Sequence, residues 1–192
     1  DFKQDGKTID IASYPALGTT IWIGALNNDA YLDIIQNGND KPTYRIIGDP
    51  TEGSLIVAAE KIGVSLDGLN KAYPRTHEIP FDSTRKRMLT VHNIEDPRTV
   101  DPSPYSDGQN KGQYVVAVKG APDIVLEFCT QYQTMDNGLA PLDNAARQRI
   151  LEANDTLTKD ALRVLGMAYY LTPSIPTETS LETLEQDLVF VG

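Results

Sequence analysis

The strongest constraint on how this chain can fold is a pair of strand-forming runs on either side of a long polar loop. Residues 87–94 (RMLTVHNI) and 113–119 (QYVVAVK) are rich in β-branched and apolar side chains, whereas residues 96–112 are rich in proline, glycine, serine and aspartate. This pattern predicts two antiparallel strands joined by a long hairpin tip. A sheet containing this pair is therefore the expected centre of the fold.

Helices and further strands alternate irregularly around this pair. Apolar residues at helical spacing, preceded by a capping Asp143, predict a long amphipathic helix over 144–162. Further strands are predicted at 43–47, 75–79, 163–170 and 187–191, and further helices at 25–36, 50–62, 66–73 and 122–129. This order indicates an α+β fold, in which a twisted antiparallel β-sheet is flanked by helices.

Size and charge limit the domain count and the partners. The 192 residues, 40% of them apolar, suit one domain that spans 1–192. The 27 acidic and 17 basic residues give a net charge of −10, which argues against nucleic acid or an anionic membrane surface as a partner. The only cysteine, Cys129, excludes an internal disulfide and fits a cytosolic setting. No apolar run reaches the ~18 residues of a membrane span, and the first residues do not resemble a signal peptide.

The usual catalytic and metal-binding motifs are missing. Residues 48–54 (GDPTEGS) have the glycine spacing of a phosphate-binding loop, but Ser54 stands where that loop needs a lysine. The sequence contains no Gly-x-Gly-x-x-Gly and no Gly-x-Ser-x-Gly motif. The two histidines, His77 and His92, form no ligand pattern and are predicted to be surface residues of strands. Nothing in the sequence therefore predicts a self-contained catalyst.

The segment 48–55 (GDPTEGSL) allows two interpretations. Asp49 can be the N-cap of a helix, Pro50 its first residue and Glu52 the acid of a capping box. Alternatively, Glu52 lies beside a cleft and accepts hydrogen bonds from the amine of a ligand. Taken alone, the segment favours the cap.

The segment 81–90 (FDSTRKRMLT) combines an aromatic residue, a basic triplet and a strand. In the predicted strand, Lys86, Met88 and Thr90 share one face, so a cation lies beside an apolar side chain. Phe81 could stack on a heteroaromatic ring. The alternatives are that Phe81 belongs to the core and that the triplet is a solvated turn.

The segment 119–123 (KGAPD) places a lysine at the end of a strand and Pro122 at the first turn of a helix. Gly120 between them permits close approach of the backbone. A lysine beside a helix N-terminus attracts anions, so Lys119 is a candidate anion-binding residue. A generic turn between strand and helix is the alternative.

These three blocks, in this order, resemble the nucleotide-binding domain of P-type cation-transporting ATPases, and most closely the calcium-pump-like branch. Residues 162–166 (LRVLG) resemble the stretch that follows the long helix of that family, and residues 27–30 (NNDA) resemble a turn near its start. The resemblance implies the fold of that domain, and it implies that the chain is a cytoplasmic domain of an integral membrane pump.

The resemblance also implies an ATP site, for which it assigns positions in this sequence. Phe81 would stack on adenine, Glu52 would accept a hydrogen bond from the adenine amine, and Thr51 would lie at the pocket edge. Lys86 and Lys119 would offset the charge of ATP. The phosphate tail would be held by Arg163, and the apolar wall and floor would consist of Met88, Gly120 and Leu165.

Three positions depart from the pattern of the family. Asp123 ends the third block where glutamate is commoner, a small change at the start of a helix. Ser83 stands where some branches have an arginine near the phosphates, which leaves Arg163 as the candidate phosphate cation. Ala161 precedes Leu162 and Arg163 where the family often has glycine, and this bears on how the long helix ends.

The reaction of the family transfers a phosphoryl group from ATP, with Mg²⁺, to an aspartate in an Asp-Lys-Thr-Gly-Thr motif that this sequence lacks. We therefore expect the chain to bind ATP without turnover and to act with the phosphorylation and actuator domains of a full-length pump, without itself contacting the membrane. Residues 1–11 and 187–192 are expected to lie close together. Two alternatives remain: an enzyme that uses Asp49 and Glu52 as acid and base, and a non-catalytic acidic protein-interaction module.

Overall fold

The structure is a computed structural model that describes residues 2–4, 6–35, 43–98, 102–175 and 181–192. Its centre is a seven-stranded sheet in the order β5-β6-β7-β10-β11-β8-β9, in which only β11 and β8 are parallel. The strands of this sheet are β5 (Arg75–Asp82), β6 (Arg87–Asn93), β7 (Tyr114–Gly120), β8 (Cys129–Gln133), β9 (Leu139–Pro141), β10 (Gly166–Thr172) and β11 (Leu188–Phe190).

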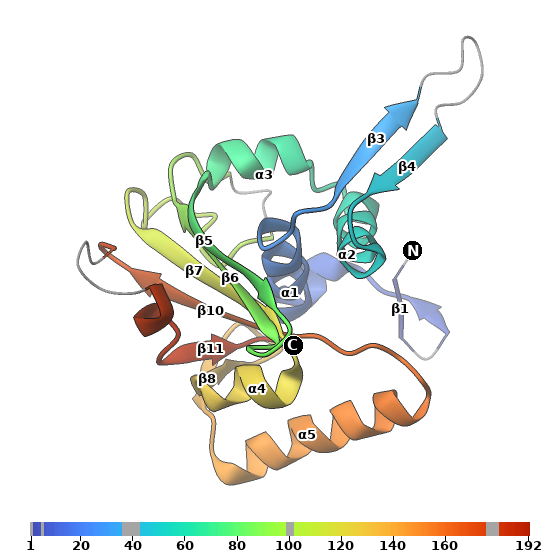
Figure 1. The fold of residues 1–192 in the computed structure, drawn as a ribbon, viewed down its shortest axis with the longest axis vertical. Helices are drawn as coiled ribbons and strands as arrows, with labels where there is room; N and C mark the ends of the chain where they lie inside the picture. The colour runs from blue at the N-terminus through green and yellow to red at the C-terminus, as the bar shows by residue number, and fades with distance from the viewer. Residues whose placement is uncertain (1, 5, 36–42, 99–101, 176–180) are drawn as a thin grey trace.

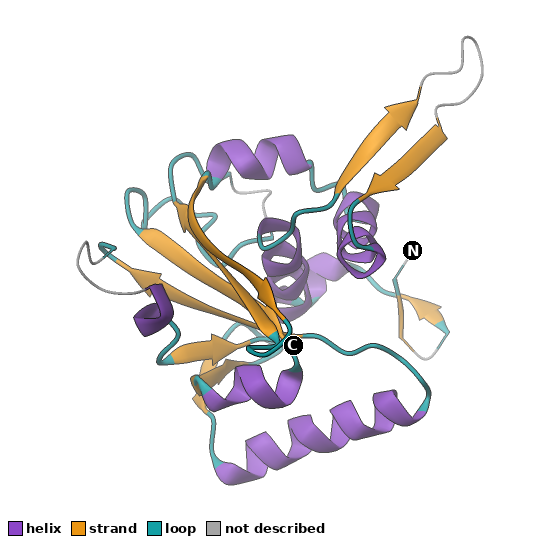
Figure 2. Cartoon of the chain, viewed as in Figure 1, coloured by secondary structure: helices purple, strands orange, loops and turns teal. Residues whose placement is uncertain are grey.

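Helices cover both faces of this sheet, and two small hairpins stand beside it (Figures 1 and 2). The helices are α1 (Pro15–Leu26), α2 (Pro50–Lys61), α3 (Leu66–Ala72), α4 (Pro122–Glu127) and α5 (Asn144–Lys159), with 3₁₀ turns η1 (Ile11–Ser13) and η2 (Leu181–Leu184). The hairpins are β1 (Lys3–Gln4) with β2 (Lys7–Thr8), and β3 (Tyr31–Ile35) with β4 (Thr43–Ile47). The predicted α+β class with an antiparallel sheet flanked by helices is confirmed.

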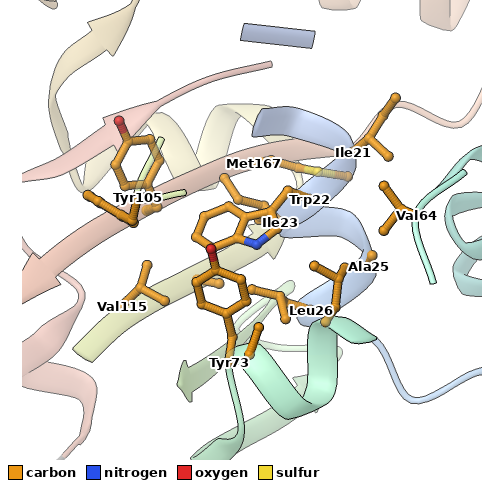
Figure 3. Close-up of a cluster of buried hydrophobic side chains, with 14 of the residues drawn as sticks. Ile21, Trp22, Ile23, Ala25, Leu26, Val64, Tyr73, Tyr105, Val115 and Met167 are labelled. Carbon is orange, nitrogen blue, oxygen red and sulfur yellow. The ribbon is translucent and has the colours of Figure 1, made fainter. Parts of the chain in front are cut away.

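Two cores lie on opposite faces of the sheet because alternate residues of its strands point in opposite directions. On β7, Val115 and Ala117 belong to the core that packs against α1, α2 and α3, which is shown in Figure 3. Val116 and Val118 belong to the core that packs against α4 and α5. The central strands are therefore apolar on both faces.

The predicted pair of strands around the long loop is confirmed. β6 and β7 are antiparallel, with Arg87 opposite Gly120 and Asn93 opposite Tyr114. The loop between them is more than a hairpin tip, because Tyr105 is buried in the first core. Its ring lies 6.1 Å from that of Trp22, measured between centroids, and the two rings meet edge to face. This contact ties the loop to α1.

Two predictions from the sequence are wrong. A helix was expected at 25–36, but α1 occupies Pro15–Leu26 and β3 occupies Tyr31–Ile35. The reason is that α1 is apolar around its whole circumference and so has no amphipathic period to detect. His92 was expected on the surface but is 1% exposed, between Tyr73 and Thr90. His77 is exposed on β5, as predicted.

Several predicted boundaries also move. The long helix ends at Lys159 rather than at 162, and the strand expected from 163 begins at Gly166, so Arg163 lies in the connecting loop.

Near the two ends of the chain, Phe2 and Val191 pack against the same core. Among the described residues, no helix is long and apolar enough to cross a membrane.

Candidate functional site

A cavity of about 640 Å³ opens at the end of β6 and β7, beside the start of α2. Its lining comes from five separate segments: the turn after α1, the start of α2, the hairpin between β5 and β6, the end of β7 and the loop before β10. All nine candidate residues line it: Thr51, Glu52, Phe81, Lys86, Met88, Lys119, Gly120, Arg163 and Leu165. Another cavity, of about 600 Å³, is lined by the N-terminal segment and by Lys61, and it contains none of the nine.

At the start of α2, Asp49 caps the helix, whereas the Glu52 carboxylate binds Lys119. Asp49 is the N-cap, and its Oδ1 accepts hydrogen bonds from the backbone N–H groups of Thr51 (2.8 Å) and Glu52 (3.4 Å). The hydroxyl and the backbone N–H of Thr51 hold the pKa of Asp49 below its ordinary value. The carboxylate of Glu52 points elsewhere: its Oε1 lies 2.7 Å from Nζ of Lys119. Of the two interpretations of Glu52, the capping box is therefore the one that the contacts of its carboxylate do not match.

Lys119 is a buried cation with fixed acceptors. Its side chain is 6% exposed, and Nζ donates to Oε1 of Glu52 and, at 2.5 Å, to the backbone carbonyl of Asn27. Burial lowers the pKa of the Lys119 ammonium, and the hydrogen bond and charge of Glu52 oppose that shift. The Lys119 ammonium is thus held at the cavity wall by the Glu52 carboxylate and the Asn27 carbonyl.

The turn that follows α1 supports this pair, although the list of nine candidates omitted it. Asn27 is fully buried, and its side-chain amide donates to the carbonyls of Met88 (3.1 Å) and Ala117 (2.8 Å). The backbone N–H of Asp29 donates to Oε2 of Glu52 at 3.2 Å. The resemblance of residues 27–30 to a family turn was the signal that could have placed these residues in the site.

The exposure of Phe81 rules out the alternative that its ring belongs to the core. It is 63% exposed and lies at the cavity, next to Pro80. Met88, by contrast, is 1% exposed and forms part of the apolar wall together with Leu165. An exposed aromatic ring beside an apolar wall offers one face to a flat ligand.

Gly120 is required by the chain itself. A Cβ atom there would lie 2.5 Å from the carbonyl oxygen of Lys86 and 2.6 Å from Cβ of Arg87. The predicted close approach of the backbone at Gly120 therefore occurs. The segment that approaches it is the turn between β5 and β6.

Lys86 lines the cavity as predicted, but its backbone is not part of the strand. It precedes β6 instead of lying within it, and its φ of +55° places it in the left-handed region at the end of the turn 83–86. Its N–H donates to the carbonyl of Asp82 at 2.7 Å. The basic triplet is not a solvated turn, because Arg85 and Arg87 both pair with the buried Glu185. Glu185 was not identified from the sequence.

Arg163 completes the cationic side of the cavity. It is exposed in the loop before β10, and its Nη1 donates to the hydroxyl of Thr51 at 3.1 Å. Lys86, Lys119 and Arg163 thus line one cavity together with the ring of Phe81 and apolar side chains. Three acids, Asp29, Asp49 and Glu52, also line it; Asp49 caps α2 and Glu52 is paired with Lys119. Such a site suits an anionic ligand that carries a flat ring. Among the described residues, no group of three or more His, Cys, Asp or Glu side chains could hold a metal ion.

Comparison with known proteins agrees with this chemistry. Residues 16–192 match the family model described as "P-type ATPase, cytoplasmic domain N". Calcium-transporting ATPase 1 of Lactococcus lactis is 33% identical over 148 residues, which cover 77% of this chain and 15% of that protein. Probable cation-transporting ATPase F of Mycobacterium tuberculosis H37Rv is 30% identical over 188 residues, which cover 98% of this chain and 18% of that protein. A calcium-transporting ATPase of Bacillus subtilis is 29% identical over 192 residues, which cover 100% of this chain and 19% of that protein. The chain thus spans less than a fifth of the length of these relatives.

Proposed function

This chain belongs to the P-type cation ATPases as their nucleotide-binding N domain, and from that premise we propose that the cavity around Phe81 and Lys119 is its ATP site. One observation carries the proposal: a ring that is 63% exposed lies at a cavity whose wall holds a buried ammonium. Stacking of a base on such a ring contributes about 1–3 kcal/mol. A purine triphosphate supplies both the ring and the anion that these groups suit.

The adenine end of the ligand belongs near Phe81. In this proposal the base stacks on Phe81 and contacts Met88 and Leu165, while Glu52 accepts a hydrogen bond from the exocyclic amine. Each carboxylate oxygen has two acceptor sites, so Glu52 can accept from the ligand and still hold Lys119. Thr51 lies next to it and orients Arg163 through its hydroxyl.

The triphosphate belongs near the three cations. Arg163 presents a planar guanidinium, which suits phosphate oxygens, and Lys86 presents a flexible ammonium in the same cavity lining. Mg²⁺ would arrive bound to the triphosphate. It supplies charge neutralisation to the phosphates, and the residues of this chain bind and orient the nucleotide.

The chemical step is assigned to other parts of the whole protein. We propose that residues 1–192 act as one domain that presents the γ-phosphate to an aspartate in a separate phosphorylation domain, with an actuator domain as a further partner. Cation transport across a membrane would then follow from that phosphorylation. The Asp49–Glu52 acid–base alternative is disfavoured, because Asp49 caps α2 and Glu52 is paired with Lys119.

Calorimetric titration of the chain with ATP tests the site. We expect saturable binding that Phe81→Ala weakens about tenfold or more, since one stacked base is lost. Lys119→Ala should weaken it at least as much, because it removes a buried cation and leaves Glu52 without its cationic partner. Lys111→Ala, at an exposed lysine in the loop before β7, is the matched control and should change the affinity less than twofold.

Equal and small effects of all three substitutions would mean that ATP binds elsewhere. NMR titration of the unmodified chain separates the remaining alternative. Saturable shifts at Phe81 and Lys119 support the ATP site, whereas their absence would favour an acidic interaction module.

A further inference from the structure

A buried carboxylate joins the nucleotide cavity to the last segment of the chain. Glu185, which follows η2, is 1% exposed and lies 98 residues from Arg87 in sequence. Its Oε1 accepts a hydrogen bond from Nη2 of Arg85, and its Oε2 accepts from Nε (3.0 Å) and Nη2 (2.5 Å) of Arg87. One acid thus binds two guanidinium groups that stand on either side of Lys86.

The arginines are themselves held in place around this carboxylate. The guanidinium of Arg87 lies over the ring of Phe128, 4.3 Å from its centroid, and its Nη1 donates to the carbonyl of Arg85 at 3.1 Å. Both side chains are largely buried, with exposed fractions of 18% for Arg85 and 14% for Arg87. Without Glu185 the two like charges would repel each other in a poorly solvated space.

The backbone of Lys86 depends on the same arrangement. Its N–H is bonded to the carbonyl of Asp82, and its own carbonyl accepts from the N–H of Ala121 at 3.0 Å. Its left-handed φ of +55° is one that residues other than glycine seldom adopt, so neighbouring contacts must stabilise it. The Glu185 carboxylate pairs with Arg85, which precedes Lys86, and with Arg87, which follows it. It therefore fixes the residues on both sides of the left-handed Lys86.

We propose that Glu185 is a positioning residue of the ATP site, which acts through Arg85 and Arg87 to hold the turn 83–86 so that Lys86 faces the cavity. The inference rests on the proposed ATP site, because it assigns Lys86 a contact with the nucleotide. Glu185 itself is absent from the cavity lining. It belongs to the segment that leads into β11, so the orientation of a nucleotide-binding turn depends on the C-terminal part of the chain.

A double-mutant cycle between Glu185 and Lys86 tests this role, because Glu185→Gln keeps the shape of the side chain and removes its charge. We expect ATP to bind about five- to tenfold more weakly, since the Lys86 ammonium is displaced rather than deleted and one charge-assisted contact corresponds to about tenfold or more. Lys86→Ala should weaken ATP binding about tenfold. Glu185→Gln added to Lys86→Ala should then change the affinity less than twofold. Glu60→Gln, at an exposed acid on α2, is the control and should have no effect in either background.

Backbone amide NMR spectra give a second readout. Glu185→Gln should shift the signals of residues 83–87 while the dispersion of the remaining signals persists. If Glu185→Gln does not fold, Arg85→Gln replaces it in the double-mutant cycle, because this variant keeps the pair between the Glu185 carboxylate and the Arg87 guanidinium. Its effect on ATP affinity should also vanish in the Lys86→Ala background.

The outcomes separate the two hypotheses. Equal effects of Glu185→Gln with and without Lys86 would show a general loss of structure and overturn the positioning role, as would unchanged ATP affinity. If the unmodified chain binds ATP and only the Glu185 substitution has no effect, the positioning role alone fails. If the unmodified chain binds no ATP, the proposed function fails and this inference fails with it.

Discussion

Asp49 and Glu52 lie three residues apart, yet their partners differ completely. Asp49 accepts from the backbone at the start of α2, so it stabilises the helix. Glu52 is one turn further on and meets the ammonium of Lys119, which arrives from the end of β7. The sequence left both roles open for Glu52 because a capping box is defined by local spacing, whereas the position of Lys119 depends on the tertiary fold. A distant cation thus determines which role an acid takes.

His92 gives a prediction about pH. Burial lowers its pKa from 6.5 to about 4, so between these values the unfolded chain binds a proton that the native protein excludes. Stability should therefore be unaffected by this residue above pH 6.5 and should fall as the pH drops from 6.5 to 4, by about 3 kcal/mol in total. Urea denaturation at a series of pH values measures this.

His77, which is exposed on the neighbouring strand, supplies the matched control. His77→Gln should leave the pH profile unchanged, whereas His92→Gln should lower stability at neutral pH and flatten the profile between pH 4 and 6.5. A profile that stays equally steep in His92→Gln would contradict the assignment of this pH dependence to His92.

Glu185 shows why a residue that supports the site from outside its lining, as proposed here, cannot be predicted from sequence. It stands in an ordinary acidic stretch (residues 182–187, ETLEQD), without a capping pattern or a metal-ligand spacing. Its importance comes from burial against two arginines that lie about half the chain away, and no local pattern encodes such a contact. The nine cavity residues were predictable because they occur in blocks that resemble a known family.

At the level of elements, the sequence was informative where residue type and flanking loops agree. β6 and β7 were predicted because both runs are rich in β-branched and apolar residues and a polar loop separates them. α1 was missed because nine of its twelve residues are buried, which leaves no polar face to give a helical period. β3 was assigned to a helix because its apolar run is too short to distinguish the two structures by periodicity.

The end of α5 departs from the pattern that helix ends prefer. The N–H of Ala161 donates to the carbonyl of Thr158, and the N–H of Leu162 donates to that of Leu157, as in a Schellman motif. Ala161 occupies the left-handed position of this motif with φ of +57°. Glycine is favoured there because it has no Cβ to clash with the backbone.

Ala161→Gly should therefore stabilise the protein by about 0.5–1 kcal/mol, because relief of backbone strain exceeds the added entropy of the unfolded chain. Ala153→Gly, at an exposed position inside the same helix, should instead destabilise it by about 1 kcal/mol. Urea denaturation of both variants measures the difference. If both destabilise to the same extent, the left-handed conformation at Ala161 is not the source of strain.

At the scale of the whole molecule, the sheet brings five distant segments to one cavity. β7 ends there with Lys119, β6 begins there, and the loop that carries Arg163 returns there before β10. This convergence follows from strand order, because β6, β7 and β10 are neighbours in the sheet. The net charge of −10 is compatible with an anion site, since three cations, Lys86, Lys119 and Arg163, line this one cavity.

The same distribution of residues predicts how the chain behaves with ATP on its own. The described side chains offer groups that bind and orient a nucleotide, while the aspartate that accepts the phosphoryl group in the family reaction has no counterpart motif in this sequence. ATP with Mg²⁺ should therefore bind without phosphate release above the buffer rate, in a coupled phosphate assay run at saturating nucleotide. Phe81→Ala identifies the source of any activity seen: release that persists in this variant comes from a contaminant. Steady release that this substitution abolishes would instead show that the cavity hydrolyses ATP by itself, and the assignment of catalysis to a separate domain would be wrong.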